Sequence, residues 1–430
     1  MTHPEPAPDV LCHPFGEPHL LDLDHRYAGL RDTAGLRRVE VGGLGEAWLC
    51  SRYADVRRIL TDSRFGLTPP APAAAPAAAP AAAPAPAVCP SSEGAAPAGA
   101  RSAAALTSDQ VNRLTRGGLK PRRIERLRGR TETIADDLLD RLEPVGRSAT
   151  DLMAGFVKPL AAEVLCELLD VPAGDRTDVR ARLLGGASTA SPPAEAEKQD
   201  RRALAHHLAD LIAARAAAGA SADDLLSTMV RARADAGDDL TLAVLTDRQL
   251  VTAALRLLLP GLQNTVLMLA NFLRALMHHR SDLERLGRHP DLVPSAVEEL
   301  IRFTPFHSTS TFPRYASEDV EIGGTLIRRG EVTVGALCAA NRDERAFAHP
   351  DTFDIGRDDN AHLGFGMGAH HCPGAALARM QLQVAIGALA RRVDDLHIAP
   401  AAVAGSVHDG EGRVIGWFDP LSATWSAIRP

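Results

Sequence analysis

The fold is decided by the stretch Phe365-Gly366-Met367-Gly368-Ala369-His370-His371-Cys372-Pro373-Gly374. It places one cysteine in a glycine-rich loop, seven residues after an aromatic side chain that would shield it from water. Gly366, Gly368 and Gly374 let the backbone pass close to the sulfur, where larger side chains would obstruct it. Backbone N–H groups of such a loop can point at the sulfur and tune its electron donation. The loop is therefore predicted to hold a cysteine thiolate against an iron.

A helix is predicted directly after this loop. The run from Ala375 to Arg392 is rich in alanine and leucine, and Pro373-Gly374 precedes it as a boundary signal. The N-terminus of a helix carries partial positive charge. A helix that begins here would therefore favour the negative charge of the thiolate.

The spacing Phe-x-x-Gly-x-x-x-Cys-x-Gly resembles the haem-binding loop of the cytochrome P450 family. The resemblance implies haem b with Cys372 as the axial iron ligand, and a thiolate ligand pushes electron density toward O–O cleavage. The alternative is a glycine-rich turn around a buried free cysteine. The loop residues that the resemblance assigns to cofactor binding are Phe365, Gly366, Gly368, His370 and Gly374.

Composition limits the class of protein. The chain has 430 residues, is 45% hydrophobic and carries a net charge of −7, so it can build a sizeable core and gives no global nucleic-acid signal. Six cysteines, at 12, 50, 89, 166, 338 and 372, lack paired spacing and do not indicate a disulfide framework. The segment 1–18 is polar and proline-rich, with no apolar core of a signal peptide or anchor. We therefore expect a soluble, cytoplasmic protein, which in the family that the chain resembles implies the monomeric bacterial type.

Most of the chain predicts helices, because apolar residues recur at three- and four-residue spacing. Strand patterns are short, at 39–49 and 320–334. The fold class is therefore mainly α (α+β), and the resemblance implies one cytochrome P450 domain over residues 1–430, with small sheets around a buried haem. The other predicted helices are 21–32, 53–61, 124–142, 150–169, 201–218 and 247–279.

One segment differs in composition. Residues 68–104 are almost entirely Ala, Pro, Ser and Gly, which cannot bury a core and predict a flexible insertion. Two interpretations remain open. The insertion is either a plain flexible loop, or a pliable lid or docking arm for a bulky or carrier-bound substrate.

The long predicted helix 247–279 contains Pro260-Gly261-Leu262-Gln263-Asn264-Thr265, which resembles the oxygen-activation segment of the family. Pro260 removes a helical hydrogen bond, so a kink is expected. Gln263 stands where the family has an acid and Asn264 where it has an alcohol. Neither carboxamide ionises near neutral pH, although both can orient water. Thr265 has a hydroxyl, but it lies one residue later and is therefore turned by about 100° around the helix from the position of Asn264.

Three interpretations of this change remain open. Oxygen activation uses ordered water or a substrate group, the enzyme performs one-electron coupling without oxygen insertion, or the site has drifted neutrally. Gly261, Gln263, Asn264 and Thr265 are the candidate catalytic residues in each case.

Several charged residues have predicted supporting roles. Glu299 and Arg302 lie one helical turn apart, and Arg357 is the expected third member of a buried ion cluster that braces the loop. The resemblance assigns Arg314 and His370 to the haem propionates. It also places a His-x-x-x-Arg pair at Ser108 and Asn112, which have lost that charge, so the adjacent Arg113 is the expected substitute.

The resemblance implies a monooxygenase that hydroxylates, epoxidises or couples an organic small molecule in bacterial specialised metabolism. Two rivals are a peroxide-dependent haem enzyme and a catalytically silent recruitment protein. Electrons would come from a ferredoxin and its reductase, and the ferredoxin would dock on a basic cluster. The alternative interpretation of this cluster is an ordinary solvated helix face. That cluster comprises Arg113, Arg116, Lys120, Arg122, Arg123, Arg126 and Arg128. Neither nucleic acid nor membrane is an expected partner.

Overall fold

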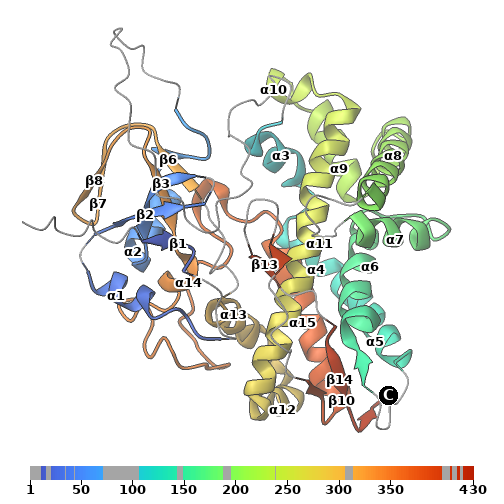
Figure 1. Cartoon of the computed structure of the whole chain (residues 1–430). Coiled ribbons are helices and arrows are strands. Elements are labelled where there is room, and N and C mark those ends of the chain that lie inside the picture. Colours follow the sequence, from blue (N-terminus) through green and yellow to red (C-terminus); the bar gives the residue numbers. More distant parts are fainter. Residues whose placement is uncertain are drawn as a thin grey trace, which may run out of the picture.

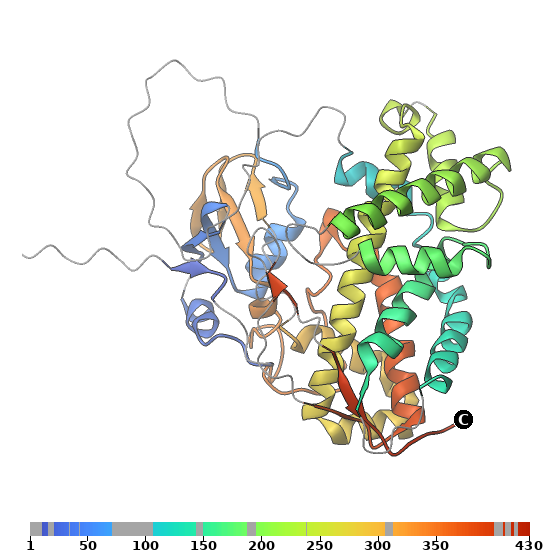
Figure 2. The same cartoon turned by 45° about the vertical axis from the view of Figure 1, so that its right-hand side comes forward.

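The computed structural model describes residues 11–15, 21–33, 35–42, 44–70, 106–142, 149–186, 195–237, 239–305, 313–399, 407–408, 414–416 and 420–430. Residues 71–104 of the predicted Ala/Pro-rich insertion lie outside this description. A helix-rich part and a smaller part built on a β-sheet lie on either side of the long helix α11 (Asp247–His278) in both views (Figures 1 and 2).

Helices make up most of the described chain, as the sequence predicts. Helix α11 packs against α6, α8 and α15, and α15 in turn packs against α4, α5, α12 and α13. The helices are α1 (Arg26–Asp32), α2 (Tyr53–Thr61), α3 (Ser108–Thr115), α4 (Pro121–Arg126), α5 (Arg128–Asp140), α6 (Lys158–Leu168), α7 (Arg176–Gly186), α8 (Glu195–Ala217), α9 (Leu225–Ala234), α10 (Leu240–Ala243), α12 (Arg280–Arg288), α13 (Val293–Phe303), α14 (Leu337–Ala340) and α15 (Ala375–Arg392), with a π-helical turn at Met153–Val157 and 3₁₀ turns at Pro290–Leu292 and Gly368–His370.

The main sheet has six strands in the order β1-β2-β3-β9-β6-β4. Strand β9 lies between β3, to which it is parallel, and β6, to which it is antiparallel, so Arg314 pairs with Thr333. Side chains alternate along β6, and this register turns Arg314 to the buried face. The strands are β1 (Cys12–His13), β2 (Arg37–Val41), β3 (Gly45–Cys50), β4 (Phe65–Gly66), β6 (Pro313–Ala316) and β9 (Val332–Gly335).

Smaller strand pairs surround the helices. The predicted strand pattern at 320–334 corresponds to the hairpin β7–β8 and to β9 of the main sheet, and β11, β14 and β5 form a three-stranded sheet. Their bounds are β5 (Thr150–Asp151), β7 (Val320–Ile322), β8 (Thr325–Ile327), β10 (Val393–Asp394), β11 (His397–Ile398), β12 (Val407–His408), β13 (Val414–Gly416), β14 (Ser422–Thr424) and β15 (Ala427–Ile428).

Helix α11 is the central element of the core. It begins at a capping box, in which Thr246 accepts a hydrogen bond from the backbone of Gln249, and it stays helical on both sides of Pro260. Among the described residues, only α11 has the length and apolar composition of a membrane-spanning helix, and 56% of its most apolar window is buried inside the protein.

The cysteines depart from the expectation in one place. Cys50, Cys166 and Cys338 are buried and free, and Cys372 is partly buried and free. Cys12, in contrast, is disulfide-bonded. The expectation of unpaired cysteines is therefore wrong for Cys12, because spacing along a sequence does not reveal which cysteines the fold brings together.

Helices α12 and α15 approach each other closely at Gly287. A Cβ atom built there would overlap the carbonyl oxygen of Ala390. We expect Gly287→Ala to lower the free energy of unfolding by about 1–3 kcal/mol, because backbone atoms cannot move aside cheaply. Denaturant unfolding would measure it.

Gly129→Ala is the matched control, because Gly129 lies in α5 and its Cβ would meet nothing within 4 Å. It should stabilise the protein slightly, since alanine loses less backbone entropy in a helix. Equal effects of the two substitutions would contradict the close packing.

Candidate functional site

The cysteine loop is fixed by its own backbone hydrogen bonds. The N–H of Cys372 donates to the carbonyl of Phe365 at 2.9 Å, and the N–H of Gly366 donates to the carbonyl of Leu363 at 2.8 Å. Gly366 and Gly368 have φ angles of 69° and 74°, in the left-handed region that favours glycine. The two predicted glycines are therefore required by the course of the chain.

The loop also lies against helix α2. A Cβ atom on Gly368 would come within 2.5 Å of the carbonyl oxygen of Leu60, near the end of that helix. Gly374 lies beside the sulfur, because its Cβ would be 3.9 Å from Cys372 Sγ. Larger side chains at either position would displace the loop from its support or crowd the thiol.

The pKa of the Cys372 thiol is set by effects that oppose one another. Burial raises its pKa, while the backbone N–H groups of Gly374 and Ala375 and the charge of Arg379 act in the opposite direction. These N–H groups belong to the start of α15, so the helix N-terminus faces the sulfur as predicted. The donors that would tune a bound thiolate are therefore in place.

A second set of side chains connects the loop to helix α13. Arg379, about one turn into α15, lies over the Phe365 ring at 4.6 Å and donates to both oxygens of Glu298 at 2.8 and 2.9 Å. His362 contacts the same carboxylate through Nε2 at 3.0 Å, and its Nδ1 accepts from the N–H of Gly364 at 3.1 Å. This cluster of Glu298, His362 and Arg379 fixes the aromatic ring beside the cysteine.

The predicted ion cluster at Glu299 is confirmed. Arg302 donates to both carboxylate oxygens of Glu299, at 2.8 and 2.7 Å, and both side chains are fully buried. Arg357 donates to the same carboxylate at 3.1 Å. The side-chain amide of Asn360 also donates to this carboxylate, at 3.1 Å, and so does the backbone N–H of Asp354, at 3.0 Å.

The remaining donors of Arg302 reach across the chain. Its guanidinium donates to the carbonyls of Asn341 and Pro350, both at 2.8 Å, and to that of Thr352 at 3.3 Å. A buried charge is tolerated only when it is fully paired, and this one is. The cluster therefore ties α13 to the segment that leads into the cysteine loop.

Arg314 has a different environment. It is 6% exposed, and its side chain donates one hydrogen bond within the described residues, to the carbonyl of its neighbour Pro313 at 3.1 Å. Burial lowers the pKa of Arg314. Among the described residues no carboxylate forms an ion pair with it. A buried guanidinium without an acid fits an anionic group such as a haem propionate.

His370 lies close to Arg314. Burial lowers the pKa of His370, the Arg314 charge lowers it further, and Asp109 opposes them. The two residues assigned to the propionates are thus brought together. Arg113 is already paired with Asp109, at 2.9 Å, and with Asp239, so its role toward a propionate remains a prediction.

Helix α11 presents one uncovered face. Pro260, Gly261 and Asn264 are exposed, although the flanking side chains of this helix are buried. A Cβ on Gly261 would meet nothing within 4 Å, so the space beside the helix is open. Thr265 is 6% exposed and turned into the core. Asn264 therefore shares the open face with Gly261, whereas Thr265 does not.

Together these features fit haem. A free thiol receives backbone donors, a buried arginine lacks an acid, and the central helix is open beside Gly261. Cys372 would hold the iron, and Arg314 and His370 would hold the propionates.

Comparison with known proteins gives the family. The Cytochrome P450 family profile matches residues 195–394. The chain is 37% identical to nocardicin C N-oxygenase of Nocardia uniformis subsp. tsuyamanensis, over 91% of this chain and 93% of the relative. It is also 37% identical to mycinamicin IV hydroxylase/epoxidase of Micromonospora griseorubida, over 93% of this chain and 94% of that relative.

The chain belongs to the cytochrome P450 family. A solved structure of the mixed-function P450 MycG superposes with a TM-score of 0.79 at 33% identity, covering 97% of this chain and 100% of that one. The predicted fold class is therefore confirmed. The protein is a cytochrome P450 monooxygenase, and its cofactor is a cysteine-ligated haem.

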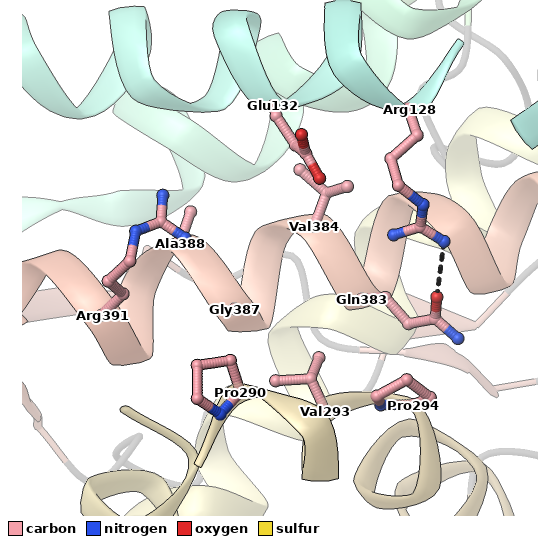
Figure 3. Close-up of a pocket in the computed structure, with 10 residues that line it drawn as sticks. All are labelled: Arg128, Glu132, Pro290, Val293, Pro294, Gln383, Val384, Gly387, Ala388 and Arg391. Carbon is pink, nitrogen blue, oxygen red and sulfur yellow. Dashed lines mark hydrogen bonds between the residues drawn. The ribbon is translucent and has the colours of Figure 1, made fainter. Parts of the chain in front are cut away.

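A separate groove lies between α5, α15 and the start of α13, with a volume of about 180 Å³ (Figure 3). Arg128 donates across it to Gln383 at 2.8 Å. Both of its arginines are neutralised, Arg128 by Glu125 and Arg391 by Asp136. None of the predicted site residues lines this groove.

Sequence reasoning missed the cluster of Glu298, His362 and Arg379. A usable signal was present, because Arg379 lies only about one turn after the predicted start of the helix at Ala375, at the end of the helix that adjoins the loop. Its acidic partner comes from a distant helix and could not be found by spacing.

The carboxylate of Glu298 should make stability sensitive to acid. Burial is the largest single effect and raises the pKa of Glu298, but the hydrogen bonds and charges of His362 and Arg379 together outweigh it and lower the pKa from 4.5 to about 2. Because the folded pKa lies below the unfolded one, this stabilisation is present above pH 4.5 and is lost as pH falls toward 2. It amounts to about 3 kcal/mol at most.

We therefore expect Glu298→Gln to lower unfolding free energy near pH 6 and to flatten its decline between pH 4.5 and 2. Denaturant midpoints across that interval provide the measurement. Glu321→Gln, which removes an exposed carboxylate on β7, is the control. An unchanged slope in Glu298→Gln would show that the pair does not stabilise the fold.

Proposed function

We propose that this P450 oxidises an organic small molecule of bacterial specialised metabolism, and that proton delivery at its oxygen-activation face runs through water or substrate rather than through an ionisable side chain. The observation that supports the proposal is the exposed face of α11, where Asn264 stands beside the open space at Gly261. Bound haem supplies O₂ activation and oxidation of the substrate.

The side chains on this face favour a water relay. A carboxamide neither gains nor loses a proton near neutral pH, but its N–H₂ donates and its oxygen accepts hydrogen bonds. Asn264 can therefore orient a water molecule without being the proton source. Thr265, whose hydroxyl would be the other candidate, points into the core.

The relatives indicate the substrate class. One relative is named for oxygenation of nocardicin C and another for oxidation of mycinamicin IV. A bulky small molecule of similar metabolic origin is the proposed substrate here. Hydroxylation, epoxidation and coupling are all compatible with that class, and one-electron coupling is the second candidate because no acid stands at Gln263 or Asn264.

Electron supply is proposed to come from a ferredoxin with its reductase, in the cytoplasm. Of the predicted basic cluster, Arg116, Lys120, Arg122 and Arg126 are exposed, and Arg126 is paired with Asp223. Arg123 is buried and paired with Asp223, so it belongs to the structure rather than to a docking surface. Helix α4 packs on α15, the helix that follows Cys372, which suits approach of an acidic partner from this side.

The identity of the iron ligand is tested by spectroscopy. Reduced wild-type protein with bound CO should show the thiolate-type absorbance band, and Cys372→His should lose it because imidazole donates less electron density than a thiolate. Cys166→Ala, a buried free cysteine on α6, is the control and should keep the band. Retention of the same band in Cys372→His would overturn the assignment.

The water relay is tested at Asn264. We expect Asn264→Ala to retain turnover within about tenfold of wild type, because water would occupy the vacated space. Gln263→Glu combined with Asn264→Thr should raise the fraction of reducing equivalents that reaches product and shift product toward simple hydroxylation.

Product distribution and peroxide release for both variants are the measurements, with haem content checked first. Loss of all product in haem-loaded Asn264→Ala would show that this side chain is essential and would contradict the relay. No change of product or coupling in the double variant would indicate neutral drift at these positions.

A further inference from the structure

Helix α11 carries an arginine on the same open face as Asn264. The exposed residues form an inclined row at four-residue spacing, Arg248, Thr252, Arg256, Pro260 and Asn264, which turns about 40° at each step, so that Arg256 lies about 80° around the helix from Asn264. Side chains four residues apart stack along one side of a helix. Arg256 therefore lies on the exposed strip that continues from Asn264 toward the N-terminus of α11.

Arg256 forms no ion pair with any residue that the structure describes. Its one described side-chain hydrogen bond runs from a terminal nitrogen to the backbone carbonyl of Leu106, at 2.7 Å. Among the described residues no carboxylate lies within ion-pair distance of it. By contrast, Arg113 and Arg233, which flank the same region, are each paired with an aspartate.

The bond to Leu106 fixes the side chain in place. Leu106 is 5% exposed and precedes Thr107, the capping residue that starts α3. The carbonyl uses one terminal nitrogen of Arg256, and a guanidinium has five N–H donors. The remaining N–H groups can donate two parallel hydrogen bonds to the two oxygens of one carboxylate.

The spacing defines where such a carboxylate would lie. Arg256 precedes Asn264 by eight residues, which is about 12 Å along the helix axis. A ligand that reaches the oxygen-activation face and extends along the open row would bring an anionic end to Arg256.

We infer that Arg256 is a specificity-determining residue that selects substrates with a carboxylate about 12 Å from the atom that is oxidised. The inference rests on the proposed function, because it assumes that the substrate lies along this face of α11. Charge-assisted hydrogen bonds with paired geometry discriminate strongly between a carboxylate and a neutral hydroxyl of similar size.

The test uses haem-loaded full-length protein and two probes, imidazol-1-yl dodecanoic acid and the matched alcohol imidazol-1-yl dodecanol. The imidazole of each probe gives an absorbance shift when it binds at the haem, so affinity is read without turnover. Wild type should bind the acid about tenfold more tightly than the alcohol, a difference expected for one charge-assisted contact near solvent.

Arg256→Gln should abolish this preference, and Arg256→Lys should restore part of it because the charge returns without the fork. Arg248→Gln is the matched control, since Arg248 lies on the same row eight residues farther from Asn264. It should keep the full preference.

Equal affinities for acid and alcohol in wild type would overturn the inference, as would a preference that persists in Arg256→Gln. Failure of the proposed function would look different. In that case the protein would lack the thiolate-type band with CO, or imidazole alone would give no shift.

Discussion

The buried carboxylate of Glu299 is the interaction on which the rest of the site depends. It accepts hydrogen bonds from Arg302, Arg357, Asn360 and the backbone of Asp354 in a place that water does not reach. Any one donor could be replaced by water at the surface, but not here, because an unpaired buried charge costs several kcal/mol. The segment before the cysteine loop is therefore held in one arrangement relative to α13.

That constraint explains why the neighbouring Glu298 can have a different task. Consecutive residues of a helix point about 100° apart, so Glu299 faces the interior while Glu298 faces the cysteine loop. Arg379 connects Glu298 with the Phe365 ring, and its charge is felt by the thiol of Cys372. One turn of α13 thus both anchors the chain that leads to the loop and orients the side chains around the sulfur.

Local sequence was sufficient where a helix is amphipathic and clearly bounded. The predicted bounds of α2 and α15 agree with the structure, and α11 ends one residue earlier than predicted. The predicted helix 150–169 was partly wrong, because residues 150–151 pair with β14 near the C-terminus. The predicted helix 124–142 is divided at Leu127, whose N–H bonds to Ile124 in a tighter turn. Pairing partners far along the chain decide such cases.

The same division applies to the site. The resemblance assigned Cys372, Arg314 and His370 to the haem, and these roles remain predictions, whereas the partners of an arginine depend on the tertiary fold. The basic cluster looked uniform in sequence, yet Arg123 is buried against Asp223 and Arg113 is paired with Asp239.

Two arginines differ from these, and the difference has a physical meaning. Among the described residues neither Arg314 nor Arg256 forms an ion pair with an acid. Leaving a guanidinium unpaired, especially one as buried as Arg314, costs free energy that a nearby aspartate would recover. Around the cysteine loop, Arg302, Arg357 and Arg379 are paired with acids. Arg314 is buried without an acid among the described residues, so we propose that it receives negative charge from a haem propionate, and, by our further inference, that Arg256 receives it from the substrate.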